Sequence, residues 1–251
     1  MYEEPTVPEI QLKKIKKFIT DTFPIEIEIE IRKNFFQFPN EEMFEKIANT
    51  RIFDFKKRFK KHVPTIDDIQ TEKENKDMSK NEDMILYDGF ELQKIITKFI
   101  PINENIDDIL HIVFTNKLTC TFDERDFRYH ARALIGSNPA IISTTGIIEA
   151  PAKPKQYYLD LMTSFSKEKI EEVKRKFKDK FLEYHDSRLH EIVEGYLLQS
   201  IIYYETGEPF CDNKECRLFN AHWQKDLLHS QLEVGKLCEN HQKILQNKIL
   251  N

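Results

Sequence analysis

Apolar residues recur along the N-terminal part of the chain with the spacing of helices in some stretches and of strands in others. Residues 8–20 carry apolar positions three and four apart, which predicts an amphipathic helix that Pro24 ends. Residues 25–31 read IEIEIEI, and this alternation predicts a strand with one face buried and one face in water. Similar helical spacing predicts helices over 40–49 and 88–100.

Short apolar runs predict further strands over residues 111–115, 129–136 and 140–147. From residue 154 onward the spacing is helical, and helices are predicted over 166–184, 187–206, 219–234 and 236–248. The segment 187–206 is apolar nearly all round, which is typical of a buried helix. Gly207 and then Pro209 provide a stop signal. This order predicts an α/β fold, with α+β as the alternative, in which a mixed sheet packs with a buried central helix and the C-terminal part is helical.

A highly charged stretch interrupts the N-terminal half at residues 64–83, PTIDDIQTEKENKDMSKNED. It is nearly free of aromatic residues and offers little apolar surface to bury. We therefore expect a mobile loop within the fold, or a linker.

Composition excludes several classes of function. The chain is 40% hydrophobic and 32% charged, with a formal net charge of −5, so a generally basic surface for nucleic acid is not expected. No run approaches the ~18–20 apolar residues of a membrane helix, and we expect no membrane partner. The first residues are acidic and polar, unlike a secretory signal, which favours a cytoplasmic location.

Three of the four cysteines lie in the last part of the chain and form a pattern with a histidine. The spacing is Cys211-x4-Cys216-x21-Cys238-x2-His241. Two short pairs joined by a longer loop can supply four ligands to one tetrahedral zinc ion. His222 is the alternative fourth ligand. Because four protein ligands leave no open position for water, this pattern predicts one structural zinc ion, not a catalytic one.

The zinc pattern resembles the end of the archaemetzincin family of zinc metallopeptidases. In that family the motif HExxHxxGxxH is followed at once by Cys-x4-Cys-x-Met and, after a helix, by Cys-x2-Cys. Here Cys211 and Cys216 match, Leu218 stands at the methionine position, and the second pair is Cys238-x2-His241. The segments GEPFC, CRLFNAHW and STTGIIEAPAKP also resemble an archaeal family described as candidate metallopeptidases.

Counting back from the first cysteine tests the catalytic part of the resemblance. The glycine of the motif falls on Gly207, which agrees, whereas its three histidines fall on Ser200, Tyr204 and Phe210 and its glutamate on Ile201. None of these four side chains can hold a catalytic zinc ion or act as the general base of HExxH. The resemblance therefore implies a metzincin-like fold whose catalytic motif is degenerate.

These observations favour a catalytically inactive metallopeptidase that binds a polypeptide. An edge strand such as 129–136 could accept an extended peptide through main-chain hydrogen bonds. We expect a metzincin-like domain over 1–207 and a zinc-binding subdomain over 208–251 packed on it.

The alternative is an active metal-dependent hydrolase with a relocated site. His190 and Glu191 begin HEIVEG, and Glu194 stands one helical turn after His190. His185 or His130 could add a third ligand. A polar helix start explains the same residues without any metal.

A second charged cluster lies between the predicted strands. Asp123, Glu124, Asp126, Arg128 and His130 could bind a polar or basic ligand, or could form a solvated loop.

Overall fold

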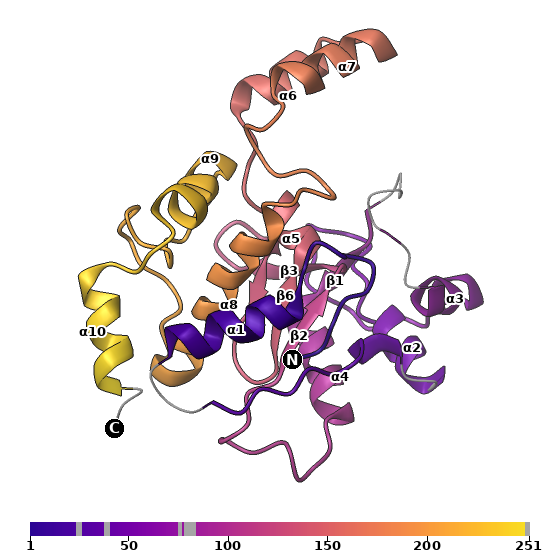
Figure 1. Ribbon diagram of the computed structural model, residues 1–251. Helices are drawn as coiled ribbons and strands as arrows, with labels where there is room; N and C mark the ends of the chain where they lie inside the picture. Colours follow the sequence, from indigo (N-terminus) through magenta and orange to yellow (C-terminus); the bar gives the residue numbers. More distant parts are fainter. Residues whose placement is uncertain (24–26, 38–40, 75–76, 78–83, 249–251) are drawn as a thin grey trace.

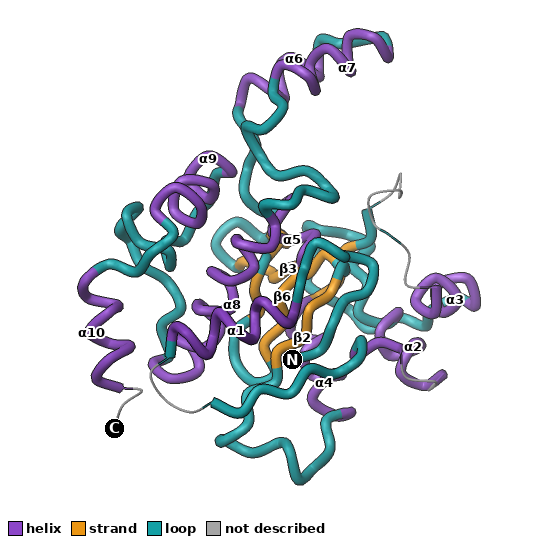
Figure 2. The backbone as a smooth tube through the Cα atoms, viewed as in Figure 1, coloured by secondary structure: helices purple, strands orange, loops and turns teal. Residues whose placement is uncertain are grey.

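The computed structural model describes residues 1–23, 27–37, 41–74, 77 and 84–248. They form a mixed α/β fold in which short strands lie at the centre and helices surround them (Figures 1 and 2). In chain order the elements are α1 (Leu12–Thr22), the 3-10 turn η1 (Phe35–Gln37), α2 (Glu41–Ala48), α3 (Ile66–Glu74), β1 (Leu86–Asp88), α4 (Gly89–Phe99), β2 (Ile112–Thr115), β3 (Leu118–Asp123), β4 (Arg128–Arg132), β5 (Leu134–Ile135), β6 (Ala140–Ser143), α5 (Thr144–Glu149), α6 (Lys155–Met162), α7 (Lys167–Lys176), α8 (Leu189–Thr206), α9 (Gln224–Leu228), the π-helical segment η3 (His229–Val234) and α10 (Glu239–Lys248).

The strands form two small mixed sheets. One has the order β1-β3-β4, with β1 parallel and β4 antiparallel to β3. The other has the order β2-β6-β5, with β2 parallel and β5 antiparallel to β6. The predicted strand 129–136 is therefore two strands, because the chain passes from one sheet to the other at Ala133.

The sheet β2-β6-β5 is covered on both faces, and alternate residues of β2 show why. Ile112 and Phe114 pack in one cluster with α1 and α8, whereas Val113 packs in another with α2 and α4. Successive side chains of a strand point to opposite faces, so a strand buried on both faces is mostly apolar and does not alternate with polar residues. All four residues of β2 and all four of β6 are buried.

The predicted helix 187–206 is confirmed as α8, and it lies in the core beside α1 and β6. It ends at Gly207, whose φ of 80° is left-handed and whose backbone N–H donates to the Tyr203 carbonyl at 2.7 Å. Glycine adopts this conformation without strain, which makes it the usual residue just after a helix end. The turn that follows carries the chain directly into the cysteine pattern.

The predicted strand 140–147 is correct only as far as Ser143, where β6 ends and α5 begins. The Ser143 hydroxyl caps α5 by accepting from the Gly146 backbone N–H at 2.8 Å. It also donates to the Lys117 carbonyl at 2.6 Å, while Thr144 and Thr145 donate to the carbonyls of Thr115 and Asn116. The hydroxyl-rich segment therefore fixes the connection between β2 and β3.

The predicted strand 25–31 is not a strand over its described part. Residues 24–26 lie outside the described residues. The burial pattern alternates from residue 27 to residue 30, because Ile27 and Ile29 are half-buried and Glu28 and Glu30 are exposed, but Ile31 is exposed as well. Sheet-like pairing occurs only at Arg32, which forms an isolated bridge with Tyr2. A segment with the right alternation becomes a strand only where a neighbouring strand offers its backbone groups.

The expectation of a loop or linker over 64–83 is wrong for residues 66–74, which form α3. Residues 75–76 and 78–83 lie outside the described residues. One buried carboxylate anchors this charged helix: Glu72 lies 2.5 Å from Lys117 Nζ and 2.6 Å from Arg51 Nη2. Arg51 follows α2 and Lys117 lies between β2 and β3, so α3 is held to other parts of the fold by charge where an amphipathic helix would be held by an apolar face.

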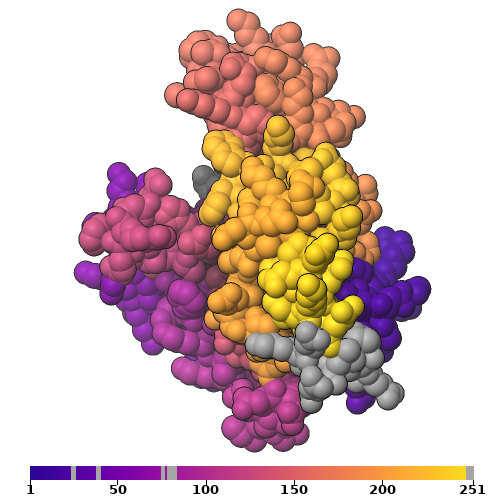
Figure 3. Space-filling view, turned by 90° about the vertical axis from the view of Figure 1, so that its left-hand side faces the viewer, coloured from indigo at the N-terminus to yellow at the C-terminus, as the bar shows by residue number. Residues whose placement is uncertain are grey.

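Helices α6 and α7 form a pair that projects from the rest of the molecule (Figures 1 and 3). A small apolar cluster around Phe177 and Phe181 holds the pair together. The helix predicted over 166–184 corresponds to α7, which is shorter than expected and ends at Lys176. Within the described residues, no helix combines the length and the apolar character needed to cross a membrane.

Candidate metal centre

The first pair of metal-binding candidates lies on the turn that follows α8. The Cys211 backbone N–H donates to the Leu218 carbonyl at 2.9 Å, and Cys211 forms a bridge with Phe219. This pairing closes the turn, so that Cys211 and Cys216 meet across it. The second pair lies at the start of α10, where the Gln242 backbone N–H bonds to the Cys238 carbonyl at 2.9 Å.

The structure brings the four predicted ligands together. One donor atom from each of Cys211, Cys216, Cys238 and His241 lies within 4.8 Å of all the others. The Cys211 and Cys238 sulfurs are 4.0 Å apart, and His241 Nδ1 lies 3.2 Å from the Cys238 sulfur and 3.8 Å from the Cys216 sulfur. Tetrahedral zinc with ~2.3 Å bonds to sulfur and ~2.0 Å bonds to nitrogen separates its donors by roughly 3.5–3.8 Å. The cluster therefore fits one such ion with little adjustment.

Backbone N–H groups point at two of the sulfurs. Asn213 donates to the Cys211 sulfur and Cys238 donates to the Cys216 sulfur, each at 3.4 Å. Burial raises the pKa of the Cys216 thiol to about 12. Burial acts the same way at Cys238, but hydrogen bonds from His241 and the neighbouring thiols outweigh it and lower that pKa to about 7. A metal binds thiolates, so it would replace the thiol protons here.

His241 belongs to the cluster and the alternative ligand, His222, does not. The His241 side chain is only 8% exposed, whereas His222 is exposed on the surface. His222 contributes a backbone carbonyl instead, which accepts from the Ala152 N–H at 2.8 Å.

The cluster is joined to α8 by close packing and by charge. Gly195 faces Gln231 so closely that an added Cβ would stand 1.7 Å from Gln231 Oε1. Gln231 in turn donates to the Arg217 carbonyl at 2.7 Å, and Arg217 donates to the Glu194 carboxylate at 3.0 Å. Figure 3 shows the C-terminal segment, in yellow, lying across the middle of one face of the molecule.

The alternative site around His190 is not assembled. His190 Nε2 and Glu194 Oε1 are 3.8 Å apart, but the other oxygen of Glu194 is bound by Arg217. Glu191 is exposed, and burial lowers the pKa of His190. Neither His190 nor Glu194 belongs to a group of three or more potential ligands within the described residues. Sequence reasoning missed Arg217, although its place beside Cys216 puts it near the helix that precedes the cysteine turn.

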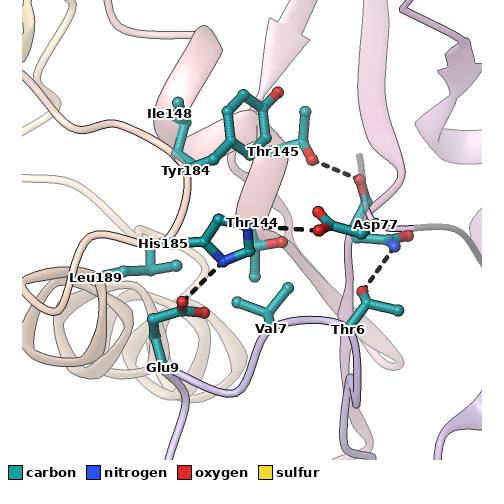
Figure 4. Close-up of a pocket in the computed structure, with 11 residues that line it drawn as sticks. Thr6, Val7, Glu9, Asp77, Thr144, Thr145, Ile148, Tyr184, His185 and Leu189 are labelled. Carbon is teal, nitrogen blue, oxygen red and sulfur yellow. Dashed lines mark hydrogen bonds and ion pairs between the residues drawn. The ribbon is translucent and has the colours of Figure 1, made fainter. Parts of the chain in front are cut away.

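His185, the third residue of that alternative, lies in a different cluster (Figure 4). Its ring nitrogens lie 3.0 Å from a Glu9 oxygen and 3.4 Å from an Asp77 oxygen. The cavity beside it, lined also by Tyr184 and Thr145, holds about 20 Å³. That is room for roughly one water molecule, which is too little for a peptide.

One family model matches nearly the whole chain. The model of the Probable metallopeptidase family (DUF6775) matches residues 1–248. The chain belongs to this family. Searches of curated proteins and of solved structures find no match. The family match spans both sheets, α8 and the cysteine cluster.

The positions that the resemblance aligned with the histidines of HExxHxxGxxH carry Ser200, Tyr204 and Phe210. The Ser200 hydroxyl donates to the carbonyl of Tyr196, one turn earlier in α8, at 2.9 Å. Tyr204 donates to the Asp107 carbonyl, and Phe210 is exposed on the surface. The Ser200 and Tyr204 hydroxyls are therefore hydrogen-bonded to backbone carbonyls, and the Phe210 side chain has no atom that binds zinc.

The other charged cluster of the family member is an exposed hairpin, β3–β4. Asp123, Asp126 and His130 do come within 4.8 Å of one another. However, Arg125 lies 2.7 Å from the Asp123 carboxylate and Arg128 lies 2.7 Å from that of Asp126. The third acid, Glu124, pairs with Arg58. Carboxylates neutralised by arginine favour the solvated hairpin over a ligand site.

The expected peptide-accepting edge is partly occupied. The Tyr129 backbone N–H donates to the Phe55 carbonyl at 2.7 Å, and the Ala133 carbonyl accepts from Ser143 at 2.8 Å. Strand addition requires a row of unpaired backbone groups. This edge therefore offers few free backbone groups to which an extended peptide could hydrogen-bond.

Proposed function

We propose that this member of the metallopeptidase family is a zinc-stabilised, metzincin-derived protein that binds a polypeptide without cleaving it. The observation that carries the proposal is the Cys3His cluster. Its four donors lie within 4.8 Å of one another. Zinc held by four protein ligands keeps no position for water and so has no nucleophile to offer.

Two further observations support the absence of peptidase chemistry. The positions of the catalytic histidines carry Ser200, Tyr204 and Phe210. The nearest substitute, the pair His190 and Glu194, is joined to Arg217, whose positive charge would oppose a metal cation at the same carboxylate.

Cys211, Cys216, Cys238 and His241 would hold the ion, and bound zinc would supply a covalent link between the cysteine turn and α10. The residues of the chain itself do the rest. The N–H groups of Asn213 and Cys238 stabilise negative charge on the sulfurs, and Arg217 joins the cluster to α8.

The second candidate function is an active metal-dependent hydrolase with its metal at His190 and Glu194. The family description favours it, as does the 3.8 Å separation of the two side chains. It requires a second metal ion, and the two functions therefore differ in metal content.

Elemental analysis of purified protein should find about one zinc ion per chain. A Cys211→Ser, Cys216→Ser variant should lose it, because half of the ligands are gone. A matched variant, His190→Ala with Glu194→Ala, should keep it, since its changes lie outside the cluster. Two zinc ions in the wild type and one in the matched variant would overturn this proposal and favour the hydrolase instead.

A further inference from the structure

A large cavity opens between the end of α8, the extended segment 27–32 and the loop before β2. Its volume is about 590 Å³, within the range of roughly 300–1,000 Å³ that is typical of ligand sites. The cavity beside His185 is far smaller. Sequence reasoning did not find this larger cavity, because its walls come from four separate parts of the chain.

The floor of the cavity is apolar. Ile19 and Phe23 contribute from α1 and the residue after it, Leu110 from the loop before β2, and Ile201 from α8. Ile19 and Phe23 belong to the main core, and Leu110 and Ile201 pack against it. An apolar side chain of a ligand would therefore meet a rigid surface and would leave water on binding.

One cation of the lining is already neutralised. Arg32 Nη1 lies 2.5 Å from the Glu104 carboxylate and Arg32 Nη2 lies 2.5 Å from that of Glu30. The pKa of each carboxylate is lowered, in each case chiefly by its hydrogen bond from Arg32. This trio contributes no positive charge that an anionic ligand could use.

Three more carboxylates stand at the rim without such a partner. Glu28, Asp108 and Glu205 all line the cavity and are exposed. Among the ion pairs of the described residues, none includes any of the three. They come from the extended segment, the loop before β2 and the last turn of α8, so negative charge is spread around the opening. Such a rim attracts cations and repels anions.

The cavity also lies over the degenerate motif. Ile201 and Tyr204, which line it, occupy the positions of the motif's glutamate and second histidine. A chain lying there would contact an isoleucine and a tyrosine where a peptidase needs a base and a metal ligand.

We infer that this acidic cavity, with its rim of Glu28, Asp108 and Glu205, binds a polypeptide segment in which lysine or arginine stands next to apolar side chains. The apolar side chains occupy the floor and the cations pair with the rim. The inference rests on the proposed function, since it names the polypeptide that an inactive family member would hold.

A fluorescein-labelled peptide of alternating lysine and leucine tests the inference by fluorescence anisotropy on the zinc-loaded full chain. We expect saturable binding that weakens as salt is added, because exposed charges are screened. A peptide with glutamate in place of lysine should not bind. Glu28→Gln with Asp108→Asn and Glu205→Gln should weaken binding by about tenfold, mainly through slower association.

The matched control is Glu168→Gln with Glu171→Gln and Glu172→Gln, which makes the same change in net charge on exposed positions of α7. This control should bind like the wild type. Equal weakening in both variants, or no binding of the lysine peptide by the wild type, overturns the inference. Mass spectrometry of the same mixtures separates the two proposals. A cleaved peptide refutes the inactive function. An intact peptide that binds the rim variant as tightly as the wild type refutes only the assignment of peptide binding to this cavity.

Discussion

Removing zinc from the Cys3His cluster is expected to destabilise the whole protein, not the C-terminal segment alone. Structural zinc contributes about 10–16 kcal/mol of apparent binding free energy in small zinc domains, as much as the roughly 5–15 kcal/mol that holds a typical domain together. Cys216 and Leu218 belong to the same apolar cluster as Ile192 and Leu197 of α8. If about a third of the zinc-binding free energy adds to the free energy of global unfolding, zinc removal should lower the melting temperature by ~10 °C.

Thermal unfolding with and without a strong chelator measures this effect. A Cys120→Ser variant is the control, because Cys120 is buried in β3 and is not a ligand. That variant has its own melting temperature, but the drop caused by the chelator should be as large as in the wild type. A Cys216→Ser variant should start low and should not respond to the chelator. A melting temperature that the chelator leaves unchanged in the wild type would exclude a stabilising metal.

Replacing Glu72 by alanine is expected to cost about 3–5 kcal/mol of the free energy of unfolding. Glu72 is buried and accepts a hydrogen bond from the Tyr87 hydroxyl at 2.9 Å in addition to its two cations. Its loss leaves Lys117 buried without an opposite charge, and the desolvation of that ammonium is no longer offset. Urea unfolding at neutral pH measures the difference, with exposed Asp67→Asn on the same helix as the control.

The same contact makes stability depend on pH. Burial alone would raise the pKa of Glu72, but the charges of Lys117 and Arg51 outweigh burial and hold it below its usual 4.5. A carboxyl with a lowered folded pKa stabilises the protein above its unfolded pKa, and this contribution is lost as pH falls through the folded pKa. The difference in unfolding free energy between wild type and Glu72→Gln should therefore be constant from about pH 7 to 5 and shrink in stronger acid. A difference that is the same at every pH would mean that the charge of Glu72 plays no part.

The helices could be predicted where an apolar stripe faces the core. The segments that became α1, α2, α4 and α8 carry such stripes or are apolar all round, and their ends fall within a few residues of the expected ones. Helix α3 could not be predicted in this way. Its stabilising contact is one carboxylate whose partners, Arg51 and Lys117, lie far from it in the sequence.

The strands were harder to predict because their stability depends on neighbours. β1 has only three residues and pairs with β3, which was not predicted as a strand and ends at Asp123, the first residue of the charged cluster. In the opposite sense, Ile27 and Ile29 have the alternation of a strand but lack a partner strand. A period of two shows which side chains could be buried together, whereas hydrogen-bonded pairing is a property of two segments.

The candidate site divides along the same line. The four candidate ligands could be predicted because their spacing is local within each pair, and the structure brings their donor atoms together. The ion pair of Arg217 with Glu194 and the rim of the acidic cavity could not be predicted, because each joins residues from distant parts of the chain. The spacing of residues within one turn predicts which side chains can share a metal ion. Whether a pair such as His190 and Glu194 is free to bind one depends on contacts with residues far away in the sequence.

The packing of α1 against α8 also determines the order in which the nascent chain can fold. Ile15 and Ile19 belong to the same apolar cluster as Ile192 and Leu197 of a helix that begins at Leu189. Residues 23–188 must be synthesised between them, which takes roughly 10–30 s at ~5–20 residues per second. During that interval the native partners of the apolar face of α1 are limited to earlier residues of the cluster, such as Ile112 and Ile142, and the contribution of α8 is missing. His241 emerges later still, so zinc can complete its coordination only when nearly all of the core has left the exit tunnel.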